Sequence, residues 1–168
     1  MSARIELLKG DITRCGTDAI VNAANNSLLG GGGVDGAIHR AAGPELFTYN
    51  KKLHGCETGQ AKISPGFWLL AKHVISTVGP VWQGGDNNED ALLANCYSNC
   101  LKLARENRLK SIAFPAISTG VYAFPIERAA AIAVKTVRDV TAINPEIQRV
   151  VFVCFNDKAM EVYKELLG

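Results

Sequence analysis

Short apolar runs alternate with amphipathic segments along this chain. Six of the runs are rich in β-branched or small apolar residues and have the usual length of strands, about 4–8 residues. Between them, apolar residues recur three and four positions apart, which is the periodicity of helices. This alternation predicts an α/β domain with a largely parallel sheet. The predicted strands cover residues 5–8, 19–22, 61–64, 73–77, 111–114 and 150–155.

Two long segments have clear helical periodicity. The first begins near Asn87 as a cap, with Glu89 and Asp90 in its first turn. The second begins at Pro125, a residue favoured in the first turn of a helix, and ends before Pro145. Further helices are predicted over residues 35–42, 45–53 and 157–167. The positions expected to be buried are Leu93, Cys96, Tyr97, Cys100, Leu101 and Ala104 in the first helix, and Ile126, Ala130, Ala133, Val137 and Val140 in the second.

The composition is that of a folded protein and not of a disordered segment. The chain has 168 residues, of which 48% are hydrophobic and 20% charged, so we expect residues 1–168 to form a single domain. No apolar run approaches the roughly 20 residues needed to cross a bilayer, and residues 1–11 lack the apolar core of a signal peptide. We therefore expect a cytoplasmic protein without a membrane partner.

Charge and cysteine content narrow the function classes further. The formal net charge is only +2 and the basic residues are scattered, so a nucleic-acid partner is not expected, although a small anionic ligand is compatible. The five cysteines form no C-x-x-C pair. Cys96 and Cys100 have a spacing seen in zinc sites, but no further ligand accompanies them. We expect buried, reduced thiols and neither a metal nor another cofactor.

Four segments that follow predicted strands carry the candidate chemistry. In an open α/β sheet, ligands bind beyond the carboxyl ends of the strands. Gly10-Asp11-Ile12-Thr13 follows the first strand, residues 25–35 follow the second, residues 118–122 follow the fifth, and Phe155-Asn156 follows the last. Together they supply a short acid, two glycine-bearing loops and two aromatic rings.

Two of these segments are suited to phosphate binding. The tetrad Gly30 to Gly33 leads into the helix expected near Asp35, so unshielded main-chain N–H groups can approach an anion at a helix N-terminus. Ser118-Thr119-Gly120 adds a second set of N–H donors and two hydroxyls. The alternatives are a surface turn and an ordinary strand-to-helix connection. Two facing loops favour a diphosphate.

Other phosphate motifs fit the sequence poorly. Gly31, Gly33 and Gly36 match G-x-G-x-x-G, the pattern of nicotinamide-dinucleotide sites. That pattern should follow the first strand directly, whereas here residues 23–30 intervene after the second strand. A Walker A loop is excluded because no Gly-Lys-Ser/Thr follows the glycines.

Asn25 precedes the glycine tetrad and Asp35 follows it. The loop would therefore place a carboxamide and a carboxylate at the same end of a bound ligand. Such a pair suits substrate positioning and water activation. The alternative is that Asn25 serves the turn and Asp35 caps the helix. His39 lies one helical turn beyond Asp35 and is expected to pack the helix, although it could line the site.

These residues resemble the MacroD-type macrodomain family. Asn22-Ala-Ala-Asn25 and Leu29-Gly-Gly-Gly-Gly-Val-Asp35-Gly-Ala-Ile-His-Arg-Ala-Ala-Gly43 are similar to the first ligand loop of that family. The resemblance extends over nearly the whole chain, through Gly10-Asp11-Ile12, Thr58-Gly-Gln-Ala61, Thr77-Val-Gly-Pro80, Ala113-Phe-Pro-Ala-Ile-Ser-Thr-Gly-Val-Tyr122 and Pro125.

The resemblance implies a three-layer α/β/α fold, with a mixed, mostly parallel sheet of about six strands, and ADP-ribose in a cleft at the strand ends. The family pattern assigns Asp11 to the adenine amino group, Phe155 to the adenine ring, and Asn25 and Asp35 to the distal ribose. The loops enclose the diphosphate. The full set implied for ligand binding is Asp11, Ile12, Ala23, Gly31, Gly32, Gly33, Val34, Ile117, Ser118, Thr119, Gly120, Val121, Tyr122 and Phe155.

The resemblance also implies an activity. Members of this type hydrolyse O-acetyl-ADP-ribose and remove single ADP-ribose units from acidic side chains, both of which are esters of the distal ribose. Asp35, the ligand's own phosphate, or both would activate the water, and Asn25 would orient the ribose hydroxyls. The expected partners are ADP-ribose, its esters and ADP-ribosylated proteins. The rival functions are a reader module that binds ADP-ribose without turnover, and a nucleic-acid-binding partner protein.

Two departures from the family pattern are visible. Ser76 stands where relatives often have histidine in Ile-His-Thr-Val-Gly-Pro, and residues 64–70 lack the usual Leu-Pro before Ala-Lys. Both positions are expected to lie away from the ligand loops and to affect local packing.

Overall fold

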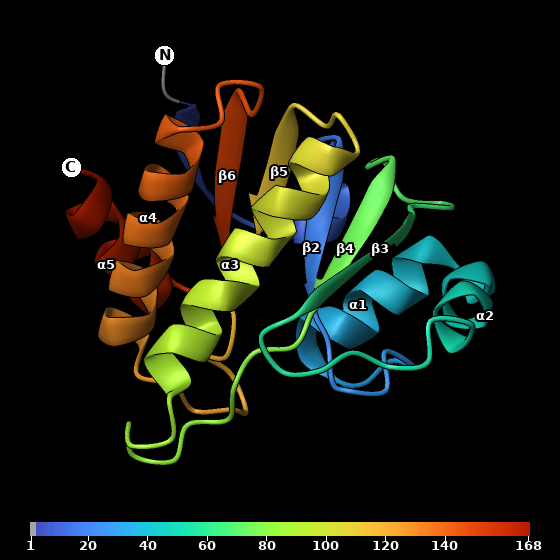
Figure 1. Ribbon diagram of the computed structural model, residues 1–168, viewed down its shortest axis with the longest axis horizontal. Coiled ribbons are helices and arrows are strands. Elements are labelled where there is room, and N and C mark those ends of the chain that lie inside the picture. The colour runs from blue at the N-terminus through green and yellow to red at the C-terminus, as the bar shows by residue number, and fades with distance from the viewer. Residues whose placement is uncertain (1–2) are drawn as a thin grey trace.

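The six predicted strands form one sheet with the order β1-β6-β5-β2-β4-β3 (Figure 1). Five of them are paired in parallel, and β3 runs antiparallel to β4 at one edge. This confirms the mixed, mostly parallel sheet. The computed structural model describes residues 3–168 and places the strands at β1 (Arg4–Lys9), β2 (Ala19–Ala23), β3 (Ala61–Pro65), β4 (His73–Thr77), β5 (Ser111–Phe114) and β6 (Arg149–Cys154).

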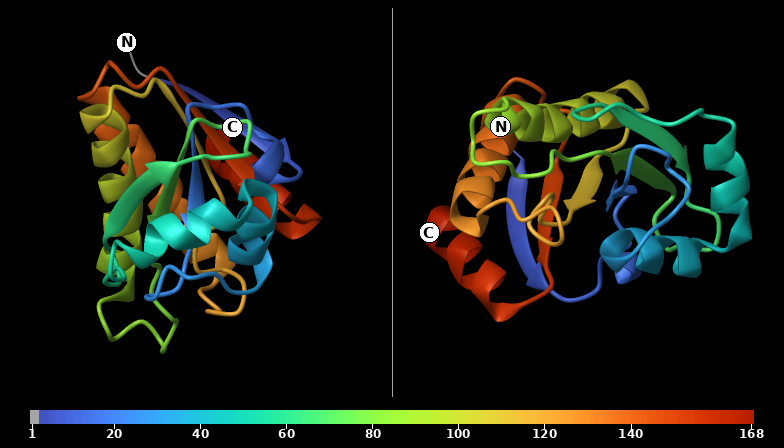
Figure 2. Two further views of the ribbon diagram at one scale, coloured as in Figure 1. Left: turned by 90° about the vertical axis from the view of Figure 1, so that its right-hand side faces the viewer. Right: turned by 90° about the horizontal axis from the view of Figure 1, so that it is seen from below.

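Helices cover both faces of this sheet and complete the expected three layers (Figure 2). One face packs against α3 (Glu89–Glu106), α4 (Ile126–Ala142) and α5 (Asp157–Leu167), with Tyr97, Phe114 and Phe152 in the larger core. The other face packs against α1 (Gly33–Ala42), α2 (Pro44–Lys51) and the short 3-10 helix η1 (Ile12–Arg14). Parallel strands buried on both faces need apolar side chains on both faces, which is why their sequences read as continuous apolar runs.

Four helix starts differ from the prediction, and the smallest difference is at α2, which begins at Pro44 instead of residue 45. Helix α3 begins after Asn88, and the Asn87 side chain bonds to Gln83 instead of capping the helix. Helix α4 begins one residue after Pro125. Helix α1 begins at Gly33, two residues before Asp35, because Gly32 is its N-cap residue. Glycine is common at the N-cap, but four glycines in a row do not show which of them begins the helix.

The predicted cores of α3 and α4 are largely confirmed. All six positions expected to be buried in α3 are buried, including Cys96 and Cys100 at 0% exposure. In α4, Ile126 and Val140 are only partly buried, and Ala129, Val134 and Thr141 lie inside instead. All five cysteines are free and buried. Within residues 3–168, no helix is both long and apolar enough to cross a membrane.

The strand register brings the candidate segments together at the carboxyl ends of the strands. Lys9 pairs with Cys154, and the Gly10 N–H donates to the Cys154 carbonyl, so Asp11 and Phe155 leave the sheet side by side. β2 lies between β5 and β4 in the sheet, so the loop after β2 emerges next to the loop after β5.

Candidate functional site

The first loop presents main-chain donors at the start of α1. In the described part of the chain, the N–H groups of Gly30 to Val34 have no protein acceptor. The last three of these residues are the N-cap Gly32 and the first two residues of α1, Gly33 and Val34. The first N–H groups of a helix lack partners inside the helix and carry a partial positive charge. Together with Gly30 and Gly31 they form a continuous row of donors suited to a phosphate.

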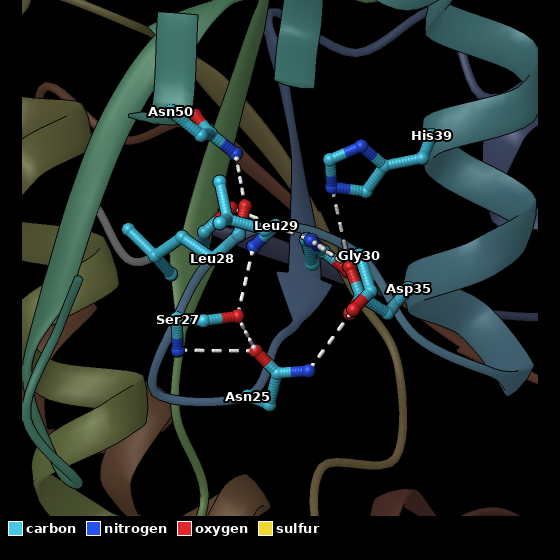
Figure 3. A network of polar contacts seen from close by, with 10 residues as sticks. Asn25, Ser27, Leu28, Leu29, Gly30, Asp35, His39 and Asn50 are labelled. Atoms are coloured by element: carbon cyan, nitrogen blue, oxygen red, sulfur yellow. Dashed lines mark hydrogen bonds and ion pairs between the residues drawn. The ribbon is translucent and has the colours of Figure 1, made fainter. Parts of the chain in front are cut away.

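Asn25 and Asp35 meet on the inner side of this loop (Figure 3). A Cβ atom built on Gly31 would lie 3.1 Å from Asp35 Oδ2 and 3.4 Å from Asn25 Nδ2. The carboxylate and the carboxamide therefore flank the same Cα atom, as the spacing in the sequence suggested. A ligand that lies on Gly31 would contact both groups.

Asn25 also organises the loop. Its Nδ2 donates to the Gly30 carbonyl at 3.0 Å, and its Oδ1 accepts from the Ser27 N–H at 3.1 Å and from the Ser27 hydroxyl at 2.6 Å. Asn50 of α2 donates to the Leu28 carbonyl at 3.0 Å and fixes the same segment from outside (Figure 3). Asn25 therefore serves the turn and faces the site at once, so the two interpretations of this residue are compatible.

Asp35 does not cap the helix. It lies in the first turn of α1, is 4% exposed, and accepts a hydrogen bond from Asn22 Nδ2 at 2.9 Å. Burial raises the pKa of its carboxyl group, against the opposing effects of the Asn22 hydrogen bond and of His39. A raised pKa makes the carboxylate a stronger base.

His39 packs against both the loop and the carboxylate. Its Nε2 atom lies 3.5 Å from Asp35 Oδ1, across one turn of α1 (Figure 3). That separation permits charge attraction when the ring is protonated but is long for a hydrogen bond. The ring also lies 3.7 Å from the position of a Cβ on Gly30. The expected packing role is thus accompanied by direct contact with Asp35.

Asn22 and Ser76 lie behind Asp35 on neighbouring strands of the sheet. The two residues are register partners on β2 and β4, and Asn22 Nδ2 lies 3.4 Å from Ser76 Oγ. Asn22 Oδ1 is buried without a partner in the described residues. Asn22 was visible in the sequence only as part of the loop motif. Its contact with Ser76 depends on the pairing of β2 with β4, which the sequence does not reveal.

The second loop supplies further main-chain donors. The N–H groups of Ser118, Gly120, Val121 and Tyr122 have no acceptor within residues 3–168. Ser118 has a φ of 68°, in the left-handed region, and its buried Oγ atom has no partner among the described residues. A Cβ on Gly79 would lie 2.1 Å from that oxygen, so only glycine at position 79 permits this conformation. Strained backbone of this kind is often found at binding sites.

The other members of the second loop differ in accessibility. Ile117 is fully buried in the core, so only its main chain is available to a ligand. Thr119 uses its hydroxyl to bond the Ala116 carbonyl at 2.8 Å. Val121 is 98% exposed, and the Tyr122 carbonyl accepts from the Trp82 N–H at 2.8 Å. The loop is therefore anchored at both ends and exposed at its tip.

The acidic side chain of Asp11 and the aromatic ring of Phe155 follow β1 and β6, away from the glycine loop. Asp11 Oδ1 accepts from the Thr13 N–H and hydroxyl at 2.9 and 2.7 Å and caps η1, and these bonds lower the pKa of the carboxyl group. Its Oδ2 has no partner among the described residues. Phe155 is 86% exposed, whereas Ile12 is buried. Ala23, the last predicted site residue, ends β2 just before Asn25.

The comparison with protein families decides the identity of this fold. The family model described as Macro domain matches residues 21–133, which include both loops. The chain belongs to the Macro domain family. This confirms the resemblance found in the sequence.

Named relatives resemble this macrodomain over nearly its full length. A Macro domain-containing protein of Chlorobaculum tepidum is 58% identical over 98% of this chain and 95% of its own. A protein of Salmonella newport named O-acetyl-ADP-ribose deacetylase is 53% identical over 99% of this chain and 96% of its own. The structure of a Trypanosoma brucei macrodomain in complex with ADP-ribose has a TM-score of 0.92 at 41% identity, covering 98% of this chain and 69% of that one.

Proposed function

We propose that this macrodomain binds ADP-ribose and hydrolyses esters of its distal ribose. The substrates are O-acetyl-ADP-ribose and proteins that carry a single ADP-ribose on an acidic side chain. The observation that carries the proposal is the position of Gly31, whose Cα lies beside both the Asp35 carboxylate and the Asn25 carboxamide. The names of the Salmonella newport relative and of the Trypanosoma brucei complex support it.

The ligand would lie across the carboxyl ends of the strands. The unpartnered N–H groups of Gly31 to Val34 would hold the diphosphate from one side, and those of Ser118, Gly120, Val121 and Tyr122 from the other. Asp11 Oδ2 would accept from the adenine amino group, and Phe155 would cover the adenine ring, since both leave the sheet side by side. The distal ribose would then lie on Gly31. Tyr122 would close over the phosphates and ribose.

Hydrolysis would proceed by attack of water on the ester carbonyl. Asp35, a ligand phosphate, or both would take a proton from the water as its oxygen bonds to the carbonyl carbon. The tetrahedral intermediate would then release the ribose oxygen, which takes up a proton, and leave a free carboxylic acid. Burial raises the pKa of Asp35, which favours the role of base. Asn25 would orient the ribose hydroxyls.

An assay with two substrates tests the proposal. The purified protein is incubated with O-acetyl-ADP-ribose and, separately, with a protein mono-ADP-ribosylated on glutamate, and release of ADP-ribose is measured. Hydrolysis of the first substrate and binding of free ADP-ribose by calorimetry are the expected results. Tight binding of ADP-ribose without hydrolysis of either substrate would favour the reader module. Retention of both Asn25 and Asp35 argues against that alternative, since binding alone uses the loops.

A further inference from the structure

A concave surface lies beside the first loop. This acceptor groove has a volume of about 540 Å³ and lies between the glycine loop, α1, α2 and Trp68. Its lining includes Gly31, Arg40, Pro44, Phe47 and Trp68. The side chains of Arg40, Pro44, Phe47 and Trp68 have no part in the site described above, and Trp68 belongs to the segment that departs from the family pattern. The expectation that residues 64–70 lie away from the ligand loops is therefore wrong.

The walls of the acceptor groove are aromatic and exposed. Phe47 is 43% and Trp68 is 70% exposed. The indole is nevertheless held in place, because it lies against the main chain at Gly43, where a Cβ would approach the ring to 2.6 Å. The main-chain N–H of Trp68 donates to the Ala42 carbonyl at 3.2 Å. Large exposed aromatic side chains held in a fixed position are typical of surfaces that bind a polypeptide.

The acceptor groove also carries an unpaired positive charge. Arg40 is exposed and has no ion pair or side-chain hydrogen bond within residues 3–168. Among the described residues that line the groove, Arg40 has the only permanent charge and none is acidic. An acidic partner complements this charge. A nucleic acid requires several such cations along its backbone, so the groove fits a polypeptide better.

The acceptor groove is continuous with the proposed reaction site. Gly31 lines the groove on one side and lies beside Asp35 and Asn25 on the other. Its carbonyl oxygen lies over Gly36, where a Cβ would be 2.5 Å from that oxygen and 3.1 Å from Arg40 Nη1. The groove thus begins at the residue on which the distal ribose is proposed to lie.

We propose that the acceptor groove binds the polypeptide whose aspartate or glutamate carries the ADP-ribose. This inference rests on the proposed function, because it concerns the group on the far side of the same ester. An acetyl group ends at its second carbon and does not extend to Phe47 or Trp68. A peptide continues from the ester in both directions, covers the aromatic walls and places neighbouring carboxylates near Arg40. The groove therefore distinguishes modified proteins from the small ester.

The test compares two substrates across matched variants. The substrates are O-acetyl-ADP-ribose and a synthetic acidic peptide with one glutamate esterified to ADP-ribose. In Phe47→Ala and Trp68→Ala, kcat/KM for the peptide should fall about tenfold, the usual loss for truncating an interface aromatic. Hydrolysis of O-acetyl-ADP-ribose should not change. Leu70→Ala is the control, since Leu70 is also 70% exposed, lies two residues from Trp68 and is not part of the groove.

A third variant tests the charge. Wild-type protein should prefer the peptide with acidic flanks over one with neutral flanks, and Arg40→Gln should remove that preference. Unchanged peptide kinetics in all three groove variants, or equal losses on both substrates, would overturn the proposal. A larger loss on an oligonucleotide with ADP-ribose on its terminal phosphate would do the same and indicate a nucleic-acid groove. If the wild-type protein hydrolyses neither ester, the proposed function itself has failed.

Discussion

Replacement of Asp35 separates binding from chemistry in this site. The proposal makes its carboxylate a base for the attacking water, whereas the phosphates are held by main-chain N–H groups. Loss of a positioned base typically lowers the rate by about 10² to 10⁴, which corresponds to roughly 2.7–5.5 kcal/mol in the activation barrier. Affinity for ADP-ribose should stay unchanged or rise, because the substitution removes a negative charge near an anionic ligand.

The structure favours Asp35→Asn over Asp35→Ala as the test. An asparagine retains an oxygen that can accept from Asn22 Nδ2, now 2.9 Å from the carboxylate. Alanine would leave that buried donor with only Ser76 Oγ at 3.4 Å, at a cost of about 1–3 kcal/mol. Even that loss is smaller than the stability of a typical domain, about 5–15 kcal/mol, so both variants should fold.

The stability of Asp35→Asn provides an internal check. The pKa of Asp35 is raised on folding, so the native state binds its proton more tightly than the unfolded state does. The contribution of Asp35 to stability is therefore greatest below its unfolded pKa and is lost as pH rises through its folded pKa. At neutral pH the asparagine variant should unfold at or above the wild-type temperature, and this difference should diminish in acid.

The assay is hydrolysis of O-acetyl-ADP-ribose together with calorimetric titration of ADP-ribose. Asp11→Asn is the matched control, because it removes a carboxylate assigned to binding while asparagine still caps η1. The control should raise KM with little change in kcat, and Asp35→Asn should lower kcat at least a hundredfold. A folded Asp35→Asn protein with turnover within about threefold of wild type would refute the assignment. The ligand phosphate would then be the base.

Three further outcomes follow from the same site. Because burial raises the pKa of Asp35, kcat/KM should increase with pH through a value above that of an ordinary aspartate, about 3.9, and Asp35→Asn should lack this step in the pH profile. Free ADP-ribose should raise the melting temperature, because at a hundredfold excess over Kd a ligand adds about 2.7 kcal/mol to the free energy of unfolding. NAD should raise the melting temperature less, and equal stabilisation by NAD would revive the dinucleotide alternative. Turnover should survive exhaustive chelation, since no three His, Cys, Asp or Glu side chains converge within residues 3–168; activity lost on chelation and restored by one metal would contradict the mechanism.

The sequence predicted the strands and the glycine loop because their signals are local. Each buried strand is a short apolar run, and all six runs became strands of one sheet. The spacing of Asn25, the glycine tetrad and Asp35 also predicted that the two polar groups meet, and the nine-residue connection 24–32 between β2 and α1 brings them together. Phe155 was placed inside the last strand by its apolar character, but β6 ends at Cys154 and leaves it exposed.

What the sequence could not predict depends on contacts between distant segments. Trp68 lies 37 positions after Gly31 (68 − 31), and the groove they share forms only because the indole packs on Gly43 at the junction of α1 and α2. Tryptophan in a turn-rich segment carries no indication of such a partner. The unpartnered Ser118 hydroxyl likewise depends on its close approach to Gly79 from the loop after β4.

The two proposed tasks of the site fall to different parts of the chain. The proposed phosphate donors are main-chain N–H groups of the two loops and of the first turn of α1. The hydrogen bond to Asp35 comes from Asn22, which is fully buried in β2 between β5 and β4 and is 0% exposed. Ser76 lies behind it in the neighbouring strand β4. A change at position 76 would therefore reach the Asp35 carboxylate through Asn22 and not through the phosphate loops.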